Sequence, residues 1–108
     1  MLPKNRRANK KDIDLLFKSG SSVSFPNLTF KFIKSSKDIP SRISFIAPKN
    51  VAKKAVDRNR LRRLGYIVLK NHIGGSPLGI VGVFIFRKYQ DDVSILENEI
   101  KKILDKIN

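Results

Sequence analysis

The chain has no cysteine, and its 108 residues include only one histidine and nine acidic residues. Without cysteine there is neither a disulfide framework nor a thiolate metal site. The acids are scattered, and no two have a metal-ligand spacing in an apolar context. His72 is expected in a turn beside glycine, where a solvated surface residue is favoured over a general base. We therefore expect no catalytic residue and no metal site in the polypeptide.

Several segment types are missing as well. No run of about 18 apolar residues is present to cross a membrane, and the N-terminus lacks the apolar region of a signal peptide. There is no P-loop, dinucleotide fingerprint or Ser/His/Asp pattern, and no internal repeat or low-complexity linker. These absences predict a cytoplasmic protein with no membrane partner and no small-molecule cofactor.

The chain has instead a large excess of positive charge. Twenty-three Lys and Arg residues against nine acids give a formal charge of +14 and a pI near 10.5. Such self-repulsion costs stability unless a polyanion offsets it, so a nucleic acid is the expected partner. An apolar content of 41%, with seven Phe, predicts a folded globule rather than a disordered tail. We expect one RNA-binding domain over residues 1–108, with residues 1–8 as a basic flexible arm.

The basic segment 53–63 reads KKAVDRNRLRR, with six cations and one acid. Drawn as a helix over about residues 52–70, its apolar residues Val56, Leu61, Leu64, Ile67 and Val68 share an arc of about 140°. Most of the cations lie on the other side, where guanidinium groups can bind phosphate bidentately. A solvated cationic face is the alternative, although solvated faces normally mix signs to gain i,i+4 pairs. Because Asp57 and Arg60 fall inside the apolar arc, we expect the first turns to project past the sheet.

The other elements follow from capping signals and periodicity. A helix is expected from Asn9 to about Ser19, ended by Gly20, and a hairpin from strands 21–25 and 28–34 around Pro26. Residues 42–47 alternate as a third strand, 80–86 form a strand buried on both faces, and an aspartate, Asp91 or Asp92, caps a last helix. The order α-β-β-β-α-β-α predicts an α+β two-layer sandwich.

Two residues have open interpretations at this level. Phe17 fits the apolar stripe of the first helix as a core residue, but it also suits a cleft in which a nucleotide stacks on the ring. Gly65 in the middle of the basic helix costs roughly 1 kcal/mol relative to Ala. Either the helix backbone packs closely on the sheet at Gly65, or the helix is weakened there.

The basic segment resembles the RNR signature of the bacterial ribonuclease P protein subunit, and the resemblance extends from Asn9 to the last helix. In that family a small protein assists a catalytic RNA that removes the 5′ leader from precursor tRNA. The resemblance implies a four-stranded sheet with a left-handed βαβ crossover, like the second domain of ribosomal protein S5. General chirality favours a right-handed crossover, and here we follow the family.

The resemblance also implies which residues bind RNA. Contacts to the catalytic RNA are expected from Lys49, Lys53, Lys54, Arg58, Asn59, Arg60, Arg62 and Arg63. The candidates for the cleft that binds the leader are Ile13, Phe17, Lys31, Arg42 and Arg87. Ile13 replaces a usual Phe and Lys31 a usual Tyr, so we expect weaker stacking and stronger electrostatics in this cleft. Asn50 replaces a usual Lys in the segment before the basic helix, where we expect one phosphate contact to be missing. Leader binding should be sequence-tolerant.

The expected partners are therefore the catalytic RNA subunit and precursor tRNA, with Mg²⁺ bound mainly by the RNA. Two alternatives stay open at this level. A structural RNA-binding protein, such as a ribosomal protein, would share the charge and the α+β plan. A DNA-binding helix-turn-helix protein would share the basic helix, but its helices are joined by a short turn, whereas strands separate the helices expected here.

Overall fold

The computed structural model describes residues 10–34, 42–73 and 79–107. The elements, in chain order, are α1 (Lys10–Ser19), β1 (Ser21–Ser24), β2 (Leu28–Lys34), β3 (Arg42–Ile46), α2 (Ala55–Ile73), β4 (Ile80–Phe86) and α3 (Val93–Ile107). This order confirms the predicted one. The basic helix begins and ends three residues later than expected, which places His72 in its last turn instead of in a turn after it. Residues 1–9, including the arm and the expected cap Asn9, lie outside the described residues.

Local hydrogen bonds explain where the outer helices begin and end. At the end of α1, Gly20 N donates to the carbonyl of Leu16 at 2.8 Å, and the chain enters β1 at the next residue. At the start of α3, Asp92 Oδ1 accepts from the backbone N–H groups of Ser94 and Ile95 at 2.9 and 3.3 Å. Asp92 is therefore the cap of the last helix, as one of the two candidates.

The four strands form one mixed sheet in the order β1-β2-β4-β3. β1 and β2 are an antiparallel hairpin, β2 and β4 pair antiparallel, and β3 pairs parallel with β4. The parallel pair is joined through α2, which confirms the βαβ crossover, while its left hand stays a prediction. β4 is central and is buried along nearly its whole length, as its apolar sequence predicts.

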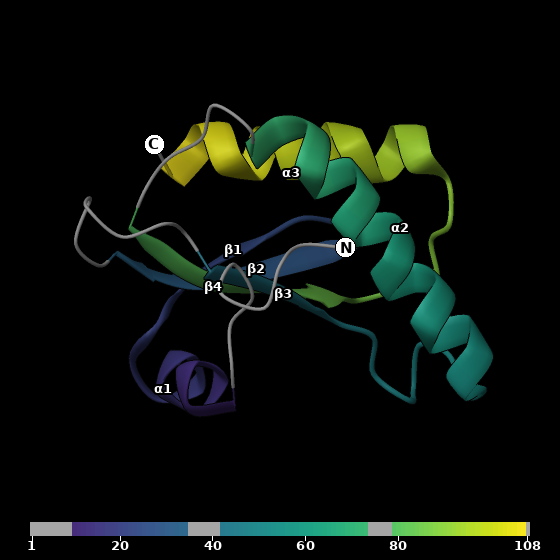
Figure 1. Ribbon diagram of the computed structural model, residues 1–108, viewed down its shortest axis with the longest axis horizontal. Helices are drawn as coiled ribbons and strands as arrows, with labels where there is room; N and C mark the ends of the chain where they lie inside the picture. The colour runs from purple at the N-terminus through teal and green to yellow at the C-terminus, as the bar shows by residue number, and fades with distance from the viewer. Residues whose placement is uncertain (1–9, 35–41, 74–78, 108) are drawn as a thin grey trace.

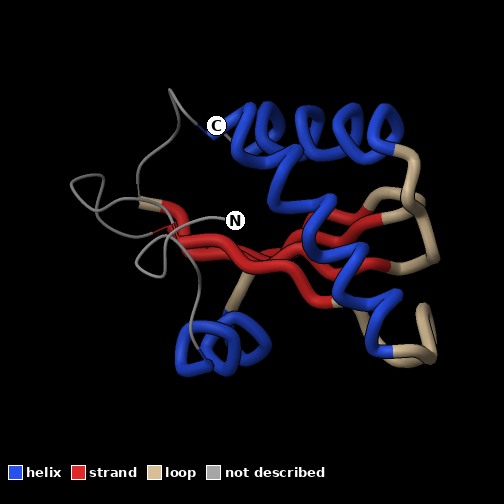
Figure 2. The backbone as a smooth tube through the Cα atoms, turned by 45° about the vertical axis from the view of Figure 1, so that its right-hand side comes forward, coloured by secondary structure: helices blue, strands red, loops and turns tan. Residues whose placement is uncertain are grey.

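Helices cover both faces of this sheet (Figure 1). α2 and α3 lie together on one face, and α1 lies on the other, in both Figure 1 and Figure 2. The α2/α3 side has the larger core, in which Phe30 stacks on Phe84 with ring centroids 4.3 Å apart. On the other side Leu16 of α1 is fully buried against Val81 and Val83. α1 thus adds a partial third layer to the expected sandwich.

The buried face of α2 is rotated from the one predicted. Val56 and Ile67, both assigned to the core, are exposed, with relative accessibilities of 68% and 50%. Tyr66 and Leu69, which were not assigned to the core, are buried there with Leu61 and Val68. The reason is the close approach of α2 to β3, which turns Gly65 toward the sheet and carries Ile67 away from it.

Candidate nucleic-acid interface

Cations gather at the start of α2. Lys53 and Lys54 are exposed just before the helix, and Lys49 is exposed in the turn that follows β3. That turn is closed by Ala52 N, which donates to the carbonyl of Pro48 at 3.1 Å. A helix N-terminus has unpaired N–H groups and about half a positive charge, so these lysines add positive charge to a positive end. Without a ligand these positive charges repel one another. An anion such as phosphate bound here relieves that repulsion.

Arg58 holds this basic segment in place. Its Nη1 donates to the carbonyl of Ala52 at 3.1 Å and to the carbonyl of Lys53 at 2.7 Å. The carbonyl of Lys54 in turn accepts from Arg58 N at 3.1 Å. The guanidinium therefore fixes the backbone that carries Lys53 and Lys54, and it has fewer donors left for phosphate than a free arginine.

The other arginines of the RNR run differ in the partners that their side chains have. Arg62 donates to the side-chain oxygen of Asn59 on the preceding turn. Arg60 forms an ion pair of 3.3 Å with Asp91, in the segment before α3. Arg63 is exposed, and its side chain forms no hydrogen bond or ion pair with a described residue. The structure thus brings the predicted RNA-binding residues together at one end of α2 and in the segment before it, with Arg63 the least engaged arginine.

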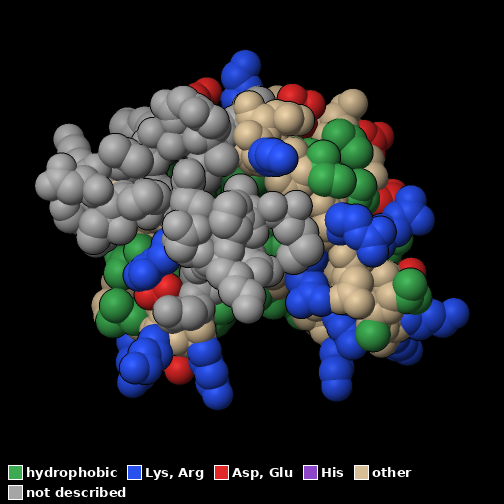
Figure 3. All heavy atoms as spheres, viewed as in Figure 1, with side chains coloured by type: hydrophobic (Ala, Val, Ile, Leu, Met, Phe, Trp, Pro, Cys, Tyr) green, Lys and Arg blue, Asp and Glu red, His purple; other side chains and the backbone are tan. Residues whose placement is uncertain are grey.

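The first turns of α2 extend beyond the sheet toward the side on which α1 lies (Figure 2), as expected. The α1-side face of the sheet is therefore flanked by α1 and by the start of α2. We call the space between them the recess. In Figure 3 the outline of the molecule is hollowed between these two flanks, and Lys and Arg side chains project from both. Both flanks of the recess therefore carry exposed cations.

The floor of the recess is a part of the sheet that α1 covers only partly. Thr29, Ile85 and Ile46 stand in one row across β2, β4 and β3, and all three are only half-buried. Their neighbours on the other face, such as Phe30 and Phe84, are fully buried. Ile46 and Ile85 also pack against the cluster that contains Leu16, so α1 and its neighbours cover this row only in part.

Phe17 and Lys31 meet at the α1 wall. Phe17 has a relative accessibility of 52%, and Lys31 Nζ lies 5.4 Å from the centroid of its ring. This distance is within the range of a cation–π contact. The core interpretation of Phe17 is therefore wrong, since its ring is exposed beside an ammonium group.

The other three cleft candidates lie on the α1 side of the sheet or at its end. Ile13 is half-buried against the Leu16 cluster, so it supports α1 more than it lines open space. Arg42, at the start of β3, pairs with Asp12 at 3.0 Å, which ties β3 to α1. Arg87 follows the last residue of β4 and donates from Nη1 to the carbonyl of Phe25 at 2.9 Å.

The candidates do not form one compact cluster. Lys31 is paired with Val83 in the sheet register, and Arg87 lies four residues farther along the chain. At about 3.4 Å per residue, roughly 14 Å separates the two positions along the strand direction. Phe17, Lys31 and Arg42 lie near α1, whereas Arg87 lies at the opposite end of the sheet. A ligand that touches all of them must be extended.

Glu99 makes polar contacts that the sequence does not predict. This carboxylate on α3 is 7% accessible and accepts from the backbone N of Asn27 at 3.2 Å and from the Asn27 side-chain amide. The carbonyl of Asn27 accepts from Arg87 N at 2.8 Å. Glu99 therefore braces the hairpin turn that holds Arg87. Glu99 lies three residues after Leu96 and four residues before Ile103, so it falls on the buried stripe of α3. This spacing could have predicted from the sequence that Glu99 is buried.

The described part of the chain has neither a cluster of metal ligands nor a helix that could span a membrane. Within residues 10–34, 42–73 and 79–107, no group of three or more His, Asp or Glu side chains could hold a metal ion. Across the same residues, no helix is long and apolar enough to span a bilayer.

Comparisons with known proteins agree on one family. The family model described as Ribonuclease P matches residues 1–108. The RNase P protein from Thermotoga maritima superposes with a TM-score of 0.82 at 25% identity, over 94% of this chain and 97% of that chain. The Staphylococcus aureus RNase P protein gives a TM-score of 0.73 at 21% identity, over 98% and 97% of the two chains. A search of curated proteins finds no match.

The family match and the fold settle the alternatives left open by the sequence. The helix-turn-helix interpretation is wrong, because β3 and β4 bound the basic helix. The match to the family model spans the whole chain, and the solved structures share the mixed sheet with its three helices. The chain belongs to the ribonuclease P protein family, whose members work with an RNA subunit in tRNA 5′ processing.

Proposed function

We propose that this chain binds the catalytic RNA of ribonuclease P through the start of α2 and holds the 5′ leader of precursor tRNA in the recess. The observation that carries the proposal is the gathering of Lys53, Lys54 and the RNR arginines at the N-terminus of a helix that also walls the recess. One protein surface can then touch both RNAs at once.

The basic end of α2 supplies affinity for the RNA subunit. Each cation that neutralises a phosphate releases counterions, which makes binding strong at low salt and weak at high salt. Arg58 acts mainly by holding the lysine backbone, and Arg62, Arg63 and the lysines reach outward. Asn59 orients Arg62 through their side-chain hydrogen bond.

The recess supplies affinity for the leader. Phe17 offers a half-exposed ring on which a base can stack, and Lys31 places a positive charge beside it. Stacking and phosphate contacts tolerate every sequence, because each base has a flat face and each nucleotide a phosphate. The spread from Phe17 to Arg87 suits an extended single strand better than a compact ligand.

Mg²⁺ held mainly by the RNA subunit would supply the hydrolytic chemistry. The polypeptide acts by binding: its cations reduce the repulsion between two polyanions, which raises substrate affinity and lowers the Mg²⁺ requirement. None of its described side chains is assigned as acid, base or nucleophile.

Reconstitution tests this proposal. The polypeptide, freed of RNA by denaturant and refolded, should not cleave precursor tRNA in Mg²⁺, and adding the RNA subunit should restore cleavage. At high salt and high Mg²⁺ the RNA alone should keep some activity, so the advantage of adding protein should shrink. RNA-free protein that cleaves precursor tRNA, with activity lost on mutating His72, would contradict the proposal.

The leader assignment needs a separate measurement. Affinity of the reconstituted enzyme for precursor tRNA should exceed its affinity for mature tRNA, and the difference should vanish when the leader is trimmed to a single nucleotide. Equal affinities for the long-leader and trimmed substrates would remove the leader from the recess while leaving RNA-subunit binding intact.

A further inference from the structure

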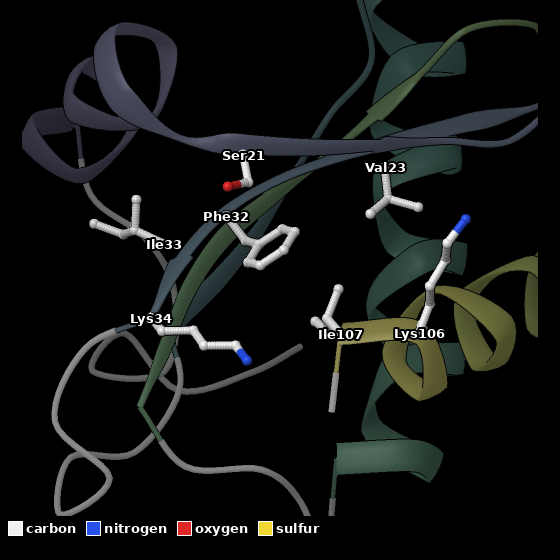
Figure 4. A pocket seen from close by; sticks show the side chains of 7 residues that line it. All are labelled: Ser21, Val23, Phe32, Ile33, Lys34, Lys106 and Ile107. Carbon is white, nitrogen blue, oxygen red and sulfur yellow. The ribbon is translucent and has the colours of Figure 1, made fainter.

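A pocket of about 650 Å³ lies far from the start of α2 in the fold. It opens between the edge strand β1, the end of β2 and the last turn of α3 (Figure 4). Its lining consists of Ser21, Val23, Phe32, Ile33, Lys34, Lys106 and Ile107. Because α3 covers the face opposite α1, this pocket is distinct from the recess.

An aromatic ring lies at the centre of the lining. Phe32 is half-buried, and its ring stacks on Phe30 with centroids 5.5 Å apart and planes 11° apart. Phe30 stacks on Phe84, and Phe84 on Phe45 at 4.9 Å. A row of stacked rings thus crosses the core and ends at Phe32. Figure 4 shows the Phe32 ring at the centre of the pocket residues. A flat aromatic ligand would extend this row.

Two lysines provide positive charge at this pocket. The side chains of Lys34 and Lys106 lie on either side of the space in front of Phe32 (Figure 4), and none of the described lining residues is acidic. Both lysines are exposed, and no described residue forms an ion pair with either of them. The apolar floor is made by Val23, Phe32 and Ile107, and the Ser21 hydroxyl adds a donor and an acceptor at the rim. The complementary ligand is flat, aromatic and anionic.

We propose that this pocket binds one nucleotide of a single-stranded RNA. The base stacks on Phe32, and the flanking phosphates bind Lys34 and Lys106. A pocket of this size holds a ligand as large as a nucleotide. A single strand is required because a base inside a duplex has no free face to offer. The site lies on the face opposite the recess, so it contacts a different segment of RNA from the one proposed for the leader.

NMR titration of the full-length protein with a single-stranded hexanucleotide RNA tests this proposal. Adding the RNA should shift the amide signals of Phe32 and Ile107. The paired substitution Lys34→Ala and Lys106→Ala should weaken binding at these signals on the order of tenfold, and it should lower the salt slope by about 0.7 per lysine. Both lysines are exposed, so the variant should keep the fold.

The matched control is the paired substitution Lys101→Ala and Lys102→Ala. These two lysines are exposed on α3 and are not among the pocket residues, so the control removes the same charge. Equal weakening by both double variants would overturn the proposal, because it would show a general charge effect. Unshifted Phe32 and Ile107 signals at saturating RNA would overturn it too. So would a pocket that binds hexanoate but not RNA, which would indicate a site for small apolar anions.

The recess and the pocket can be separated in the same experiment. Phe17→Leu should leave the Phe32 and Ile107 titration unchanged, whatever it does to signals from α1. If Phe17→Leu abolished both sets of shifts, the pocket would not be an independent site. Failure of leader binding in the recess would not affect the pocket result, so the experiment tests the two proposals independently.

Discussion

Gly65 of α2 lies against the ring of Phe45 so closely that a Cβ at position 65 would stand 2.5 Å from two ring carbons. Phe45 is 3% accessible and stacks on Phe84 at 4.9 Å, so its ring has no room to retreat. The close-packing interpretation of this glycine is confirmed. This contact fixes how far α2 descends onto β3, and with it where the basic start of the helix projects.

Gly65→Ala should destabilise the fold even though alanine favours a helix. The gain in helix propensity is about 1 kcal/mol, while overpacking a buried contact costs about 1–3 kcal/mol. We expect a lower free energy of unfolding in urea, by up to about 2 kcal/mol. Asn71→Ala, at an exposed position of the same helix, is the control and should change stability by less than about 0.5 kcal/mol. A stabilised Gly65→Ala variant would contradict the close contact.

The sequence predicts the elements well because each has a complete local signal. β4 has an unbroken apolar run, α3 has a regular stripe with Asp92 as cap, and Gly20 ends α1. Each signal depends on a few neighbouring residues, and no partner from elsewhere in the chain is needed to interpret it.

The orientation of α2 could not be predicted in the same way. The apolar periodicity predicts that Val56 faces the core, but Val56 lies in the part of the helix that projects past the sheet and is exposed. A glycine has no side chain to mark a buried face, although Gly65 lies at the closest contact with β3. Contacts between distant segments, such as Arg60 with Asp91, depend on this orientation and were missed for the same reason.

Two arginines of the RNR run should respond differently to truncation. Arg63→Ala should lower the salt slope of binding to the RNA subunit by about 0.7–0.9 and leave stability unchanged, because no described residue is its partner. Arg58→Ala should also lower the melting temperature, since it removes hydrogen bonds to the carbonyls of Ala52 and Lys53. Binding titrations at several salt concentrations and thermal melts measure both effects. Lys102→Ala on α3 is the charge-matched control, and an unchanged slope for Arg63→Ala would remove that residue from the interface.

Asp91 limits the charge that Arg60 can offer to RNA. Both side chains are substantially exposed, so their ion pair contributes at most about 1 kcal/mol to stability. Asp91→Asn should therefore leave the melting temperature nearly unchanged and tighten binding to the RNA subunit about twofold to threefold at low salt. Asp105→Asn, an exposed position on α3, makes the same change in net charge. If both variants tighten binding equally, the effect comes from net charge and not from the freed Arg60.

Phe17 should matter for the leader and not for the fold. Phe17→Leu keeps most of the apolar volume, loses the ring and leaves Lys31 without its cation–π contact. Because the side chain is half-exposed, we expect a small change in melting temperature and a loss of about 1–3 kcal/mol in affinity for leader-bearing precursor tRNA. Affinity for mature tRNA should not change. Leu15→Ala tests an exposed apolar residue of the same helix, and loss of stability without loss of leader affinity in Phe17→Leu would sink the cleft assignment.

Glu99→Gln should destabilise the fold although it preserves the shape of the side chain. The carboxylate accepts from both the backbone N–H and the side-chain amide of Asn27. A carboxamide has only one acceptor oxygen. In one of the two contacts its NH₂ group would therefore face an N–H donor of Asn27. The site is largely buried, and an unsatisfied donor there costs about 1–3 kcal/mol in the free energy of unfolding.

A double-mutant cycle with Asn27→Ala separates this contact from other effects of Glu99→Gln. Asn27→Ala removes the side-chain amide and keeps the backbone N–H, so Glu99→Gln should cost less in the Asn27→Ala background by about 0.5–3 kcal/mol. Urea unfolding of the four proteins gives this coupling energy. Because the carbonyl of Asn27 also accepts from Arg87 N, amide hydrogen exchange at Arg87 should speed up in Glu99→Gln. Additive effects together with unchanged exchange at Arg87 would show that Glu99 does not brace the hairpin turn.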